Sequence, residues 1–276
     1  MGLEVLIAED ARRLGPGAYL RPRPQEEDRC GAFHTGESIG PLRPWFQERG
    51  TGVKCPAVGT KEVLLEVYRR LLSAYGPQGW WPGESAFEVA VGAILTQATN
   101  WRNAAKAIAN LKAAGVLSPE GLWRMSAAEI AELIRPAGYF NQKAKRLRAF
   151  LELVREHGGL VELFSLPTET LRERLLAVPG IGPETADSIV LYAAEKPSFV
   201  IDAYTRRILS RLGLIRGHEG YADLKRMFEE NIPRDLELYK EYHALLVRHG
   251  KVHCRARPRC GGCPLEDMCS FPQKRG

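Results

Sequence analysis

The sequence lacks a long hydrophobic run, and this absence argues against a membrane-spanning helix. Its longest apolar stretch lies around Val89 to Leu95, far short of the roughly 20 residues that cross a bilayer. The first residues also lack the order of basic, apolar and small residues that marks a secretory signal. We therefore expect a cytoplasmic protein with no membrane partner.

The sequence also lacks convincing runs of alternating strand residues and any internal repeat. Apolar residues instead recur at helical spacing from Lys61 onward, as in Val63, Leu64, Val67 and Leu71. Further helices are predicted at 126–134, 142–157, 168–177, 183–194, 203–212, 221–230 and 236–248, joined by short turns marked by Gly or Pro. We therefore predict an all-α fold whose 276 residues form one or two compact lobes.

Residues 1–60 differ in character from the rest of the chain. They are rich in Gly, Pro and Arg and show no sustained periodicity, which predicts an irregular or partly disordered extension. The segment carries Cys30, His34 and Cys55, but their wide spacing favours solvent-side residues over a metal site.

The remaining four cysteines are concentrated near the C-terminus. Cys254, Cys260, Cys263 and Cys269 form a C-x5-C-x2-C-x5-C pattern, which is typical of a metal or cluster site in a reducing compartment rather than of a disulfide framework. Four thiolates this close in sequence can bind either a [4Fe-4S] cluster or a tetrahedral zinc ion. Spacing alone does not separate these two cofactors.

The net charge of +6 and the pI near 9.0 suit an anionic partner such as nucleic acid. A candidate contact is the Gly180-Ile181-Gly182 turn between two predicted helices. Glycine allows the backbone to approach another surface, and the N–H groups that begin the next helix, near Thr185, can bind a phosphate oxygen. A plain helix-to-helix turn with a glycine stop is the alternative interpretation.

The context of this turn favours the functional interpretation. The string from Val178 to Ala186, an apolar helix and then the segment 199–208 around Asp202 together resemble the helix-hairpin-helix, Gly/Pro-rich, aspartate motif of the endonuclease III superfamily. The resemblance covers residues from about 61 to 269 and implies a DNA glycosylase. It also favours a [4Fe-4S] cluster over zinc, although the first cysteine interval is one residue shorter than usual.

The resemblance makes Asp202 the catalytic residue. Base removal leaves positive charge on the sugar, which a carboxylate beside C1′ can stabilise while it orients or deprotonates the attacking water. Relatives that also nick the strand carry a lysine nucleophile two residues after the second glycine. Glu184 occupies that position here, and a carboxylate cannot form a Schiff base. We therefore predict a monofunctional glycosylase; Lys143 and Lys196 do not occupy the matching place.

The stretch that begins at Trp80-Trp81-Pro82 and continues through Phe87 to Trp101 is rich in aromatic residues and bears on substrate choice. Stacked aromatic side chains read a flipped base, and a cationic alkylated purine gains roughly 0.5–2 kcal/mol from a tryptophan face. The stretch resembles the 3-methyladenine DNA glycosylase branch, whose bacterial members lack the cysteine cluster. The match implies a base pocket built from Trp80, Trp81, Pro82, Trp101, Tyr204 and Glu184. Packing between lobes is the alternative role of the tryptophans.

The same match implies the architecture and the partner. Two helical lobes are expected to flank a cleft, one at 82–195 and the other formed by 61–81 and 196–253, with a cluster loop at 254–269. We expect a monomer, associated with the nucleoid, that binds double-stranded DNA containing a damaged base. The DNA contacts predicted from the match are Gln97, Gly180, Ile181, Gly182, Thr185, Lys143, Lys145 and Arg146.

Two other functions stay open from the sequence. The chain could excise uracil or thymine opposite guanine, or another deaminated base, because that branch also lacks the lysine and often keeps the cluster. It could instead be a non-catalytic module that binds DNA structures, although Asp202 in its motif argues against this. The leading expectation is excision of an alkylated purine such as 3-methyladenine.

Overall fold

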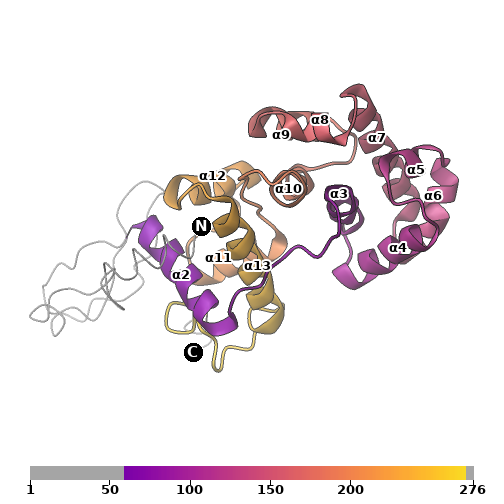
Figure 1. The fold of residues 1–276 in the computed structure, drawn as a ribbon. Helices are drawn as coiled ribbons and strands as arrows, with labels where there is room; N and C mark the ends of the chain where they lie inside the picture. The colour runs from indigo at the N-terminus through magenta and orange to yellow at the C-terminus, as the bar shows by residue number, and fades with distance from the viewer. Residues whose placement is uncertain (1–58, 272–276) are drawn as a thin grey trace, which may run out of the picture. The chain divides into compact units, whose positions relative to one another are not determined.

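The computed structural model describes residues 59–271, whose regular elements are all helices, with no strand among them (Figure 1). The all-α prediction is therefore confirmed. The predicted extension at 1–60, with Cys30, His34 and Cys55, lies almost wholly outside the described residues. No helix in the described part of the chain is both long and apolar enough to cross a membrane.

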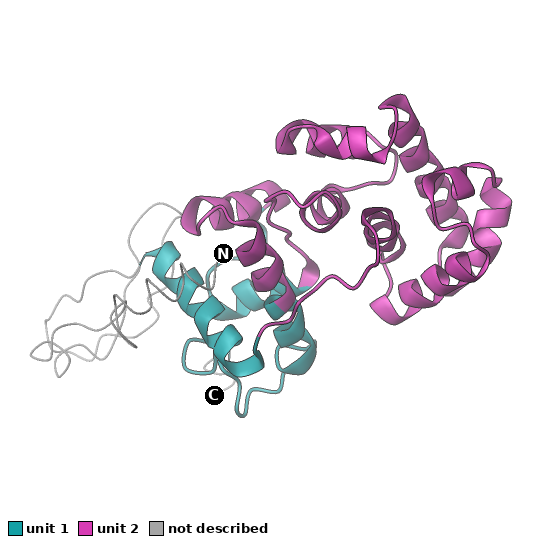
Figure 2. Cartoon of the chain, in the orientation of Figure 1, with its two compact units in different colours: residues 1–76, 204–219, 245–276 teal, residues 77–203, 220–244 magenta. Residues whose placement is uncertain are grey.

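The described residues divide into two compact units (Figure 2). Unit 1 comprises the described residues of 59–76, 204–219 and 245–271. It contains helix α2 (Thr60–Tyr75), most of α11 (Ala203–Leu212) and the last part of α13 (Leu236–Val252). Its buried side chains include Leu64, Leu71 and Ile208, and the four C-terminal cysteines belong to it.

Unit 2 comprises residues 77–203 and 220–244. Its helices are α3 (Ala86–Leu95), α4 (Trp101–Ala113), α5 (Pro119–Trp123), α6 (Ala127–Leu133), η1 (Arg135–Ala137), α7 (Phe140–Glu156), α8 (Leu160–Ser165), α9 (Thr168–Leu176), α10 (Pro183–Ser188), η2 (Ile189–Ala193) and α12 (Tyr221–Asn231), together with the first part of α13. Helix α3 is buried along nearly its whole length and packs against α4, α7, α10 and η2. It is therefore the central helix of this unit.

Local sequence sets the beginnings of the helices that carry the candidate site. The Ser85 hydroxyl accepts a hydrogen bond from the backbone of Glu88 at the start of α3, and the Asn100 side chain accepts one from Asn103 at the start of α4. Such caps satisfy N–H groups that the first helical turn leaves without partners. The Asn100 cap fixes the chain just after the segment that contains Gln97.

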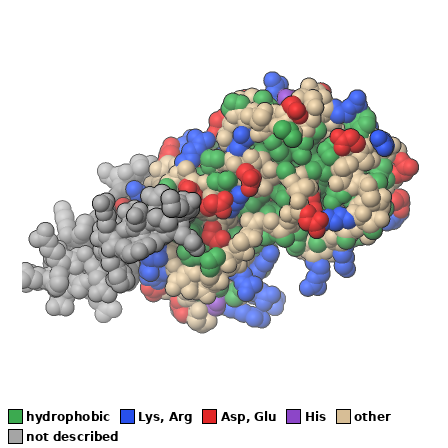
Figure 3. Space-filling model, in the orientation of Figure 1, with side chains coloured by type: hydrophobic (Ala, Val, Ile, Leu, Met, Phe, Trp, Pro, Cys, Tyr) green, Lys and Arg blue, Asp and Glu red, His purple; other side chains and the backbone are tan. Residues whose placement is uncertain are grey.

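The units differ from the predicted lobes at residues 77–81, 196–203 and 220–244. The sequence groups these three segments with the lobe formed by 61–81 and 196–253, whereas contacts in the structure place them in unit 2. Part of the physical reason is polar contact with the other predicted lobe, because Lys225 of α12 lies 3.4 Å from Asp187 and His243 Nδ1 lies 2.7 Å from the Tyr192 hydroxyl. On the face drawn in Figure 3, acidic and basic side chains are interspersed, so the net positive charge does not form one uniform field there.

Candidate active site and DNA-binding hairpin

Aromatic side chains from four parts of unit 2 meet in one cluster. Trp80 stacks on Trp81 with centroids 5.4 Å apart, and Trp81 meets Trp101 edge-on at 5.3 Å. Tyr192 of η2 lies 5.2 Å from Trp81, and His243 of α13 stacks on Trp80 at 5.8 Å. Three of the predicted pocket residues, Trp80, Trp81 and Trp101, are therefore brought together.

Two neighbouring features hold the tryptophans in place. The Glu241 carboxylate accepts hydrogen bonds from the backbone of Gln78, at 2.6 Å, and of Gly79, at 3.4 Å, which anchors the chain just before Trp80. Gly92 of α3 leaves room for two rings, since a Cβ there would lie 3.4 Å from both Trp101 Cζ3 and Trp81 Nε1. A larger side chain at that position would push the rings away from α3.

Asp202 lies beside this aromatic cluster. Its Oδ2 is 3.6 Å from His243 Nε2, and His243 Nδ1 is 2.7 Å from the Tyr192 hydroxyl. All three side chains are buried. Burial raises the pKa of Tyr192 well above its ordinary value, and the charges of Asp202 and Glu241 add to this effect, so the Tyr192 hydroxyl keeps its proton at neutral pH.

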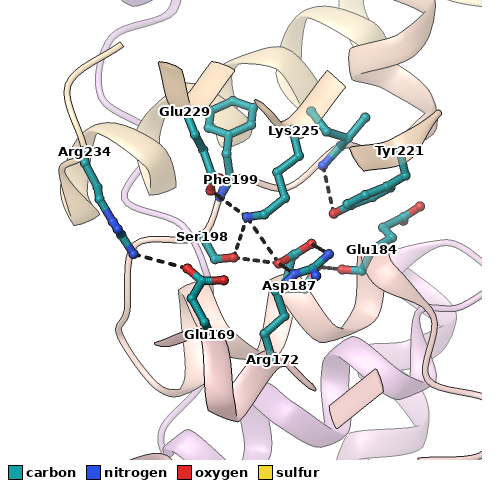
Figure 4. Close-up of polar contacts among 12 residues, drawn as sticks. Glu169, Arg172, Glu184, Asp187, Ser198, Phe199, Tyr221, Lys225, Glu229 and Arg234 are labelled. Atoms are coloured by element: carbon teal, nitrogen blue, oxygen red, sulfur yellow. Dashed lines mark hydrogen bonds and ion pairs between the residues drawn. The ribbon is translucent and has the colours of Figure 1, made fainter. Parts of the chain in front are cut away.

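A buried polar network fixes the chain between the hairpin and Asp202 (Figure 4). The Asp187 carboxylate is fully buried and accepts hydrogen bonds from Arg172 Nε at 2.7 Å and from Ser198 Oγ at 2.6 Å. Lys225 Nζ of α12 lies 3.4 Å from Asp187 Oδ1 and donates to Ser198 Oγ at 2.7 Å. Three segments of unit 2 therefore converge on one carboxylate.

The network continues along the residues that lead into Asp202. Glu229 accepts a hydrogen bond from the backbone of Phe199 at 2.9 Å, and the Tyr221 hydroxyl accepts one from the backbone of Ile201 at 3.4 Å. The segment from Phe199 to Ile201 is apolar and buried, so these backbone bonds satisfy polar groups that water does not reach. Asp202 thus follows a segment whose backbone is held at two points by side chains of α12.

The hairpin joins α9 to α10, and Gly180 has the positive φ that favours glycine whereas Gly182 does not. Gly180 has a φ of +84°, and a Cβ there would lie 2.5 Å from Arg146 Nε. Gly182 precedes Pro183, the first residue of α10. Ile181 is buried and its N–H donates to Val178 O at 3.0 Å, while Gly182 is exposed.

Several predicted DNA contacts meet at this hairpin. Gln97 Nε2 donates to Gly180 O at 3.0 Å and to Thr185 Oγ1 at 2.9 Å. Arg146 Nη1 donates to Gln97 Oε1 at 2.6 Å. The amide of Gln97 is therefore held between α7 and the hairpin.

Other predicted residues lie elsewhere. Lys143 is 1% exposed and donates to Leu95 O at 2.8 Å and Ala137 O at 2.7 Å, so its amine does not face solvent for a phosphate contact. It instead satisfies carbonyls at the ends of α3 and η1, and burial lowers its pKa to about 8. Lys145 is exposed on the same helix.

The three remaining pocket residues occupy different surroundings. Pro82 is exposed, and so is Glu184 near the start of α10. Tyr204 belongs to unit 1, where its ring lies against the backbone of Gly250 and under the Arg207 guanidinium. Of the six predicted pocket residues, the three tryptophans form the observed cluster, and Pro82, Glu184 and Tyr204 do not belong to it.

The four C-terminal cysteines line one pocket in unit 1, together with Arg211 and His249. Arg211 Nη1 donates to Cys254 Sγ at 3.3 Å, and burial raises the pKa of the Cys263 thiol to about 11. The four cysteine sulfurs in this pocket could bind a group that takes four thiolates. A bound metal centre would favour the deprotonated form of these thiols. Within residues 59–271, however, no three Cys, His, Asp or Glu side chains form a group that could hold a single metal ion.

Sequence reasoning missed Tyr192 and His243. Both lie in apolar helical segments and were indistinguishable from core residues. They are 51 positions apart, so no local spacing relates them to each other or to Asp202. Only the packing of η2 against α13 reveals the pair.

Comparison with known proteins agrees with this geometry. Residues 91–234 match the family model described as HhH-GPD superfamily base excision DNA repair protein, and the chain belongs to this family. A proposed DNA repair glycosylase of Methanocaldococcus jannaschii is 47% identical over 211 residues, which cover 75% of this chain and 96% of that protein. The chain is thus a DNA glycosylase of base excision repair.

Other relatives show the breadth of the family. The endonuclease III of Sulfolobus acidocaldarius is 29% identical over 68% of this chain and 82% of its own. A Helicobacter pylori 3-methyladenine DNA glycosylase bound to 1,N6-ethenoadenine superposes with a TM-score of 0.60, is 29% identical and covers 70% of this chain and 98% of its own. An endonuclease III–DNA complex superposes with a TM-score of 0.68 at 22% identity, covering 78% and 97%, which shows the shared fold.

Proposed function

We propose that this glycosylase excises an alkylated purine, such as 3-methyladenine, from double-stranded DNA and leaves the strand intact at the abasic site. The observation that carries the proposal is the cluster of Trp80, Trp81, Trp101 and Tyr192 beside Asp202. An electron-rich aromatic surface binds a cationic purine more strongly than a neutral pyrimidine. The similarity to a 3-methyladenine glycosylase points the same way.

The proposed reaction requires no proton donor for the departing base. In a cationic purine, the C1′–N bond breaks with its electron pair going to the base, which leaves as a neutral molecule without an added proton. Asp202 stabilises the positive charge that develops on the sugar. A water oxygen then bonds to C1′, and the proton of that water passes to the Asp202 carboxylate.

The absence of strand cleavage is proposed from Glu184. A lyase step needs an amine that attacks C1′ and forms a Schiff base. Glu184 follows the hairpin at the place where the strand-nicking relatives carry lysine, and it has no amine. Lys143 is buried against two carbonyls, so its amine is not presented as a replacement nucleophile.

We also propose that Cys254, Cys260, Cys263 and Cys269 hold a [4Fe-4S] cluster. Four thiols line one pocket, and four thiolates are the ligand set that such a cluster takes. The resemblance of the cysteine spacing to the cluster loop of endonuclease III favours the cluster over zinc. The cluster would supply a structural link across the C-terminal loop.

The test uses the full chain and a panel of duplex oligonucleotides. These contain 3-methyladenine or a stable analogue, 1,N6-ethenoadenine, hypoxanthine, or uracil or thymine opposite guanine. We expect release of the alkylated purine, with strand breakage only after hot alkali, and no release by an Asp202→Asn variant. Activity confined to the mispaired pyrimidines would refute the substrate, and a borohydride-trapped covalent complex would refute the monofunctional mechanism.

A further inference from the structure

A buried histidine faces the candidate catalytic carboxylate. His243 is 4% exposed, and its Nε2 lies 3.6 Å from Asp202 Oδ2. This nitrogen is buried and has no hydrogen-bond partner among residues 59–271. A separation of 3.6 Å is slightly longer than a direct hydrogen bond, and contacts of this kind commonly tighten when substrate binds.

The hydrogen bond at the other ring nitrogen, Nδ1, determines where the proton of the neutral imidazole lies. His243 Nδ1 is 2.7 Å from the Tyr192 hydroxyl, which also lies 3.3 Å from the carbonyl of Lys240. If Tyr192 donates to Nδ1, the neutral ring carries its proton on Nε2. If Tyr192 donates to Lys240, a neutral ring would turn an Nε2 lone pair toward the Asp202 carboxylate, which is repulsive.

Both favourable arrangements therefore aim an N–H group at Asp202. They are the neutral ring that accepts from Tyr192 and the charged ring that donates to it. The stack of His243 on Trp80, with 12° between the rings, fixes the plane of the imidazole. Burial of all three side chains keeps water from competing for this N–H group.

We propose that His243 is a positioning residue for Asp202, and that Tyr192 selects the histidine tautomer whose Nε2–H orients the carboxylate and stabilises its negative charge. The inference rests on the proposed glycosylase role of Asp202. It assigns His243 no contact with the base and no proton transfer. The packing of Tyr192 against α13 becomes, on this view, part of the catalytic arrangement.

The test compares two replacements of His243 in the full chain. His243→Phe keeps a flat ring on Trp80 but has no N–H group, whereas His243→Gln places an amide N–H near the position of Nε2. A hydrogen bond to a charged group contributes enough to change a rate by about 10- to 100-fold. We expect His243→Phe to lower the single-turnover cleavage rate by that factor, and His243→Gln to stay within about threefold of wild type.

Folding and binding provide the controls. Thermal unfolding and the Kd for duplex carrying a tetrahydrofuran abasic analogue are measured for each variant, and we expect both to change little. Tyr192→Phe removes the tautomer-selecting hydroxyl, so it should slow cleavage as well. The double variant His243→Phe/Tyr192→Phe should be no slower than His243→Phe alone, because the two residues act through one contact.

Nitrogen NMR gives a readout independent of activity. Long-range proton–nitrogen correlation, with the His243 signal assigned from His243→Gln, should show a proton on Nε2 in the wild-type chain. Observation of a neutral ring protonated only on Nδ1 would overturn the proposal. So would a His243→Phe rate within threefold of wild type, or a loss in His243→Gln as large as that in His243→Phe.

The failure of this inference is separable from failure of the proposed substrate. Rates are measured on whichever lesion of the panel the wild-type chain cuts. Cleavage of mispaired uracil alone would refute the alkylpurine proposal and still decide the role of His243. A wild-type chain that cuts none of the lesions would refute both.

Discussion

Replacement of Asp187 by asparagine tests the network that links α12 to the hairpin. The Asp187 side chain is fully buried, and its ionic partners Arg172 and Lys225 are only 20% and 11% exposed. Asparagine keeps the shape but removes the charge and turns one acceptor into a donor. Breaking a buried pair on one side costs about 3–5 kcal/mol. Because Lys225 keeps its 2.5 Å contact with Glu229, we expect about 3 kcal/mol.

The assay is thermal unfolding followed by circular dichroism. A loss of about 3 kcal/mol corresponds to a fall in Tm of roughly 6–12 °C for a protein of this size. Glu132→Gln is the matched control, since it makes the same acid-to-amide change in an exposed pair with Arg135 and should leave Tm unchanged. A Tm of Asp187→Asn within about 2 °C of wild type would refute the reasoning, because it would mean that the buried charges need no partner.

Three further predictions concern backbone geometry, proton binding and the cysteine pocket. Gly180→Ala should lower the free energy of unfolding by about 1–3 kcal/mol, because φ is +84° and the new Cβ would displace Arg146. Gly182→Ala is the control and should unfold as wild type does, because Gly182 has a φ of −88° and open space around its Cβ position. Equal urea midpoints for the two variants would contradict the prediction. The pKa of Lys143 is about 8 when folded and 10.5 ordinarily, so between these values the unfolded chain binds a proton that the folded chain does not, and stability should rise with pH by up to about 1.4 kcal/mol per unit. Raised pKa values of the buried Cys263 thiol and Tyr192 hydroxyl act in the opposite sense, so the change in stability between pH 8 and pH 10, measured by urea unfolding, is compared between wild type and Lys143→Met. Stability should rise more in wild type than in the variant, and an identical change in both would exclude Lys143 as a source. Cys263→Ser should abolish the bound iron, expected at about four atoms per chain by elemental analysis, whereas Cys55→Ser should retain it; iron retained in Cys263→Ser, or zinc in the wild-type chain, would refute the cluster.

Local patterns in the sequence were sufficient for most of the helices. Helix α11 spans Ala203–Leu212 as predicted, and α12 and α13 begin at the predicted Tyr221 and Leu236. These helices are amphipathic, so their apolar spacing carries the signal. The short helices α5 and α8 were not predicted, because five or six residues hold too few turns for a periodic pattern.

Features set by distant parts of the chain were not predictable. The sequence suggested one helix over 183–194, but the structure has α10 followed by the π-helical η2, a segment whose residues are all buried and so show no periodicity. Lys143 was assigned to DNA from the family match, whereas its amine binds the carbonyls of Leu95 and Ala137, which no local pattern relates to it. Sequence motifs pointed to Asp202 and the three tryptophans as candidate site residues, whereas no motif pointed to His243, which lies beside them.

The π-helical turn of η2 has an evolutionary consequence. Its backbone is closed by the bond from Ala194 N to Ile189 O at 2.9 Å, so it holds one residue more than an α-helical turn would. Such turns are bulges within α-helices and are frequent at functional sites. Deleting one residue before Tyr192 would restore the α-helical period and rotate this ring by about 100°. A single deletion could therefore remodel the aromatic cluster while every tryptophan in it stays unchanged.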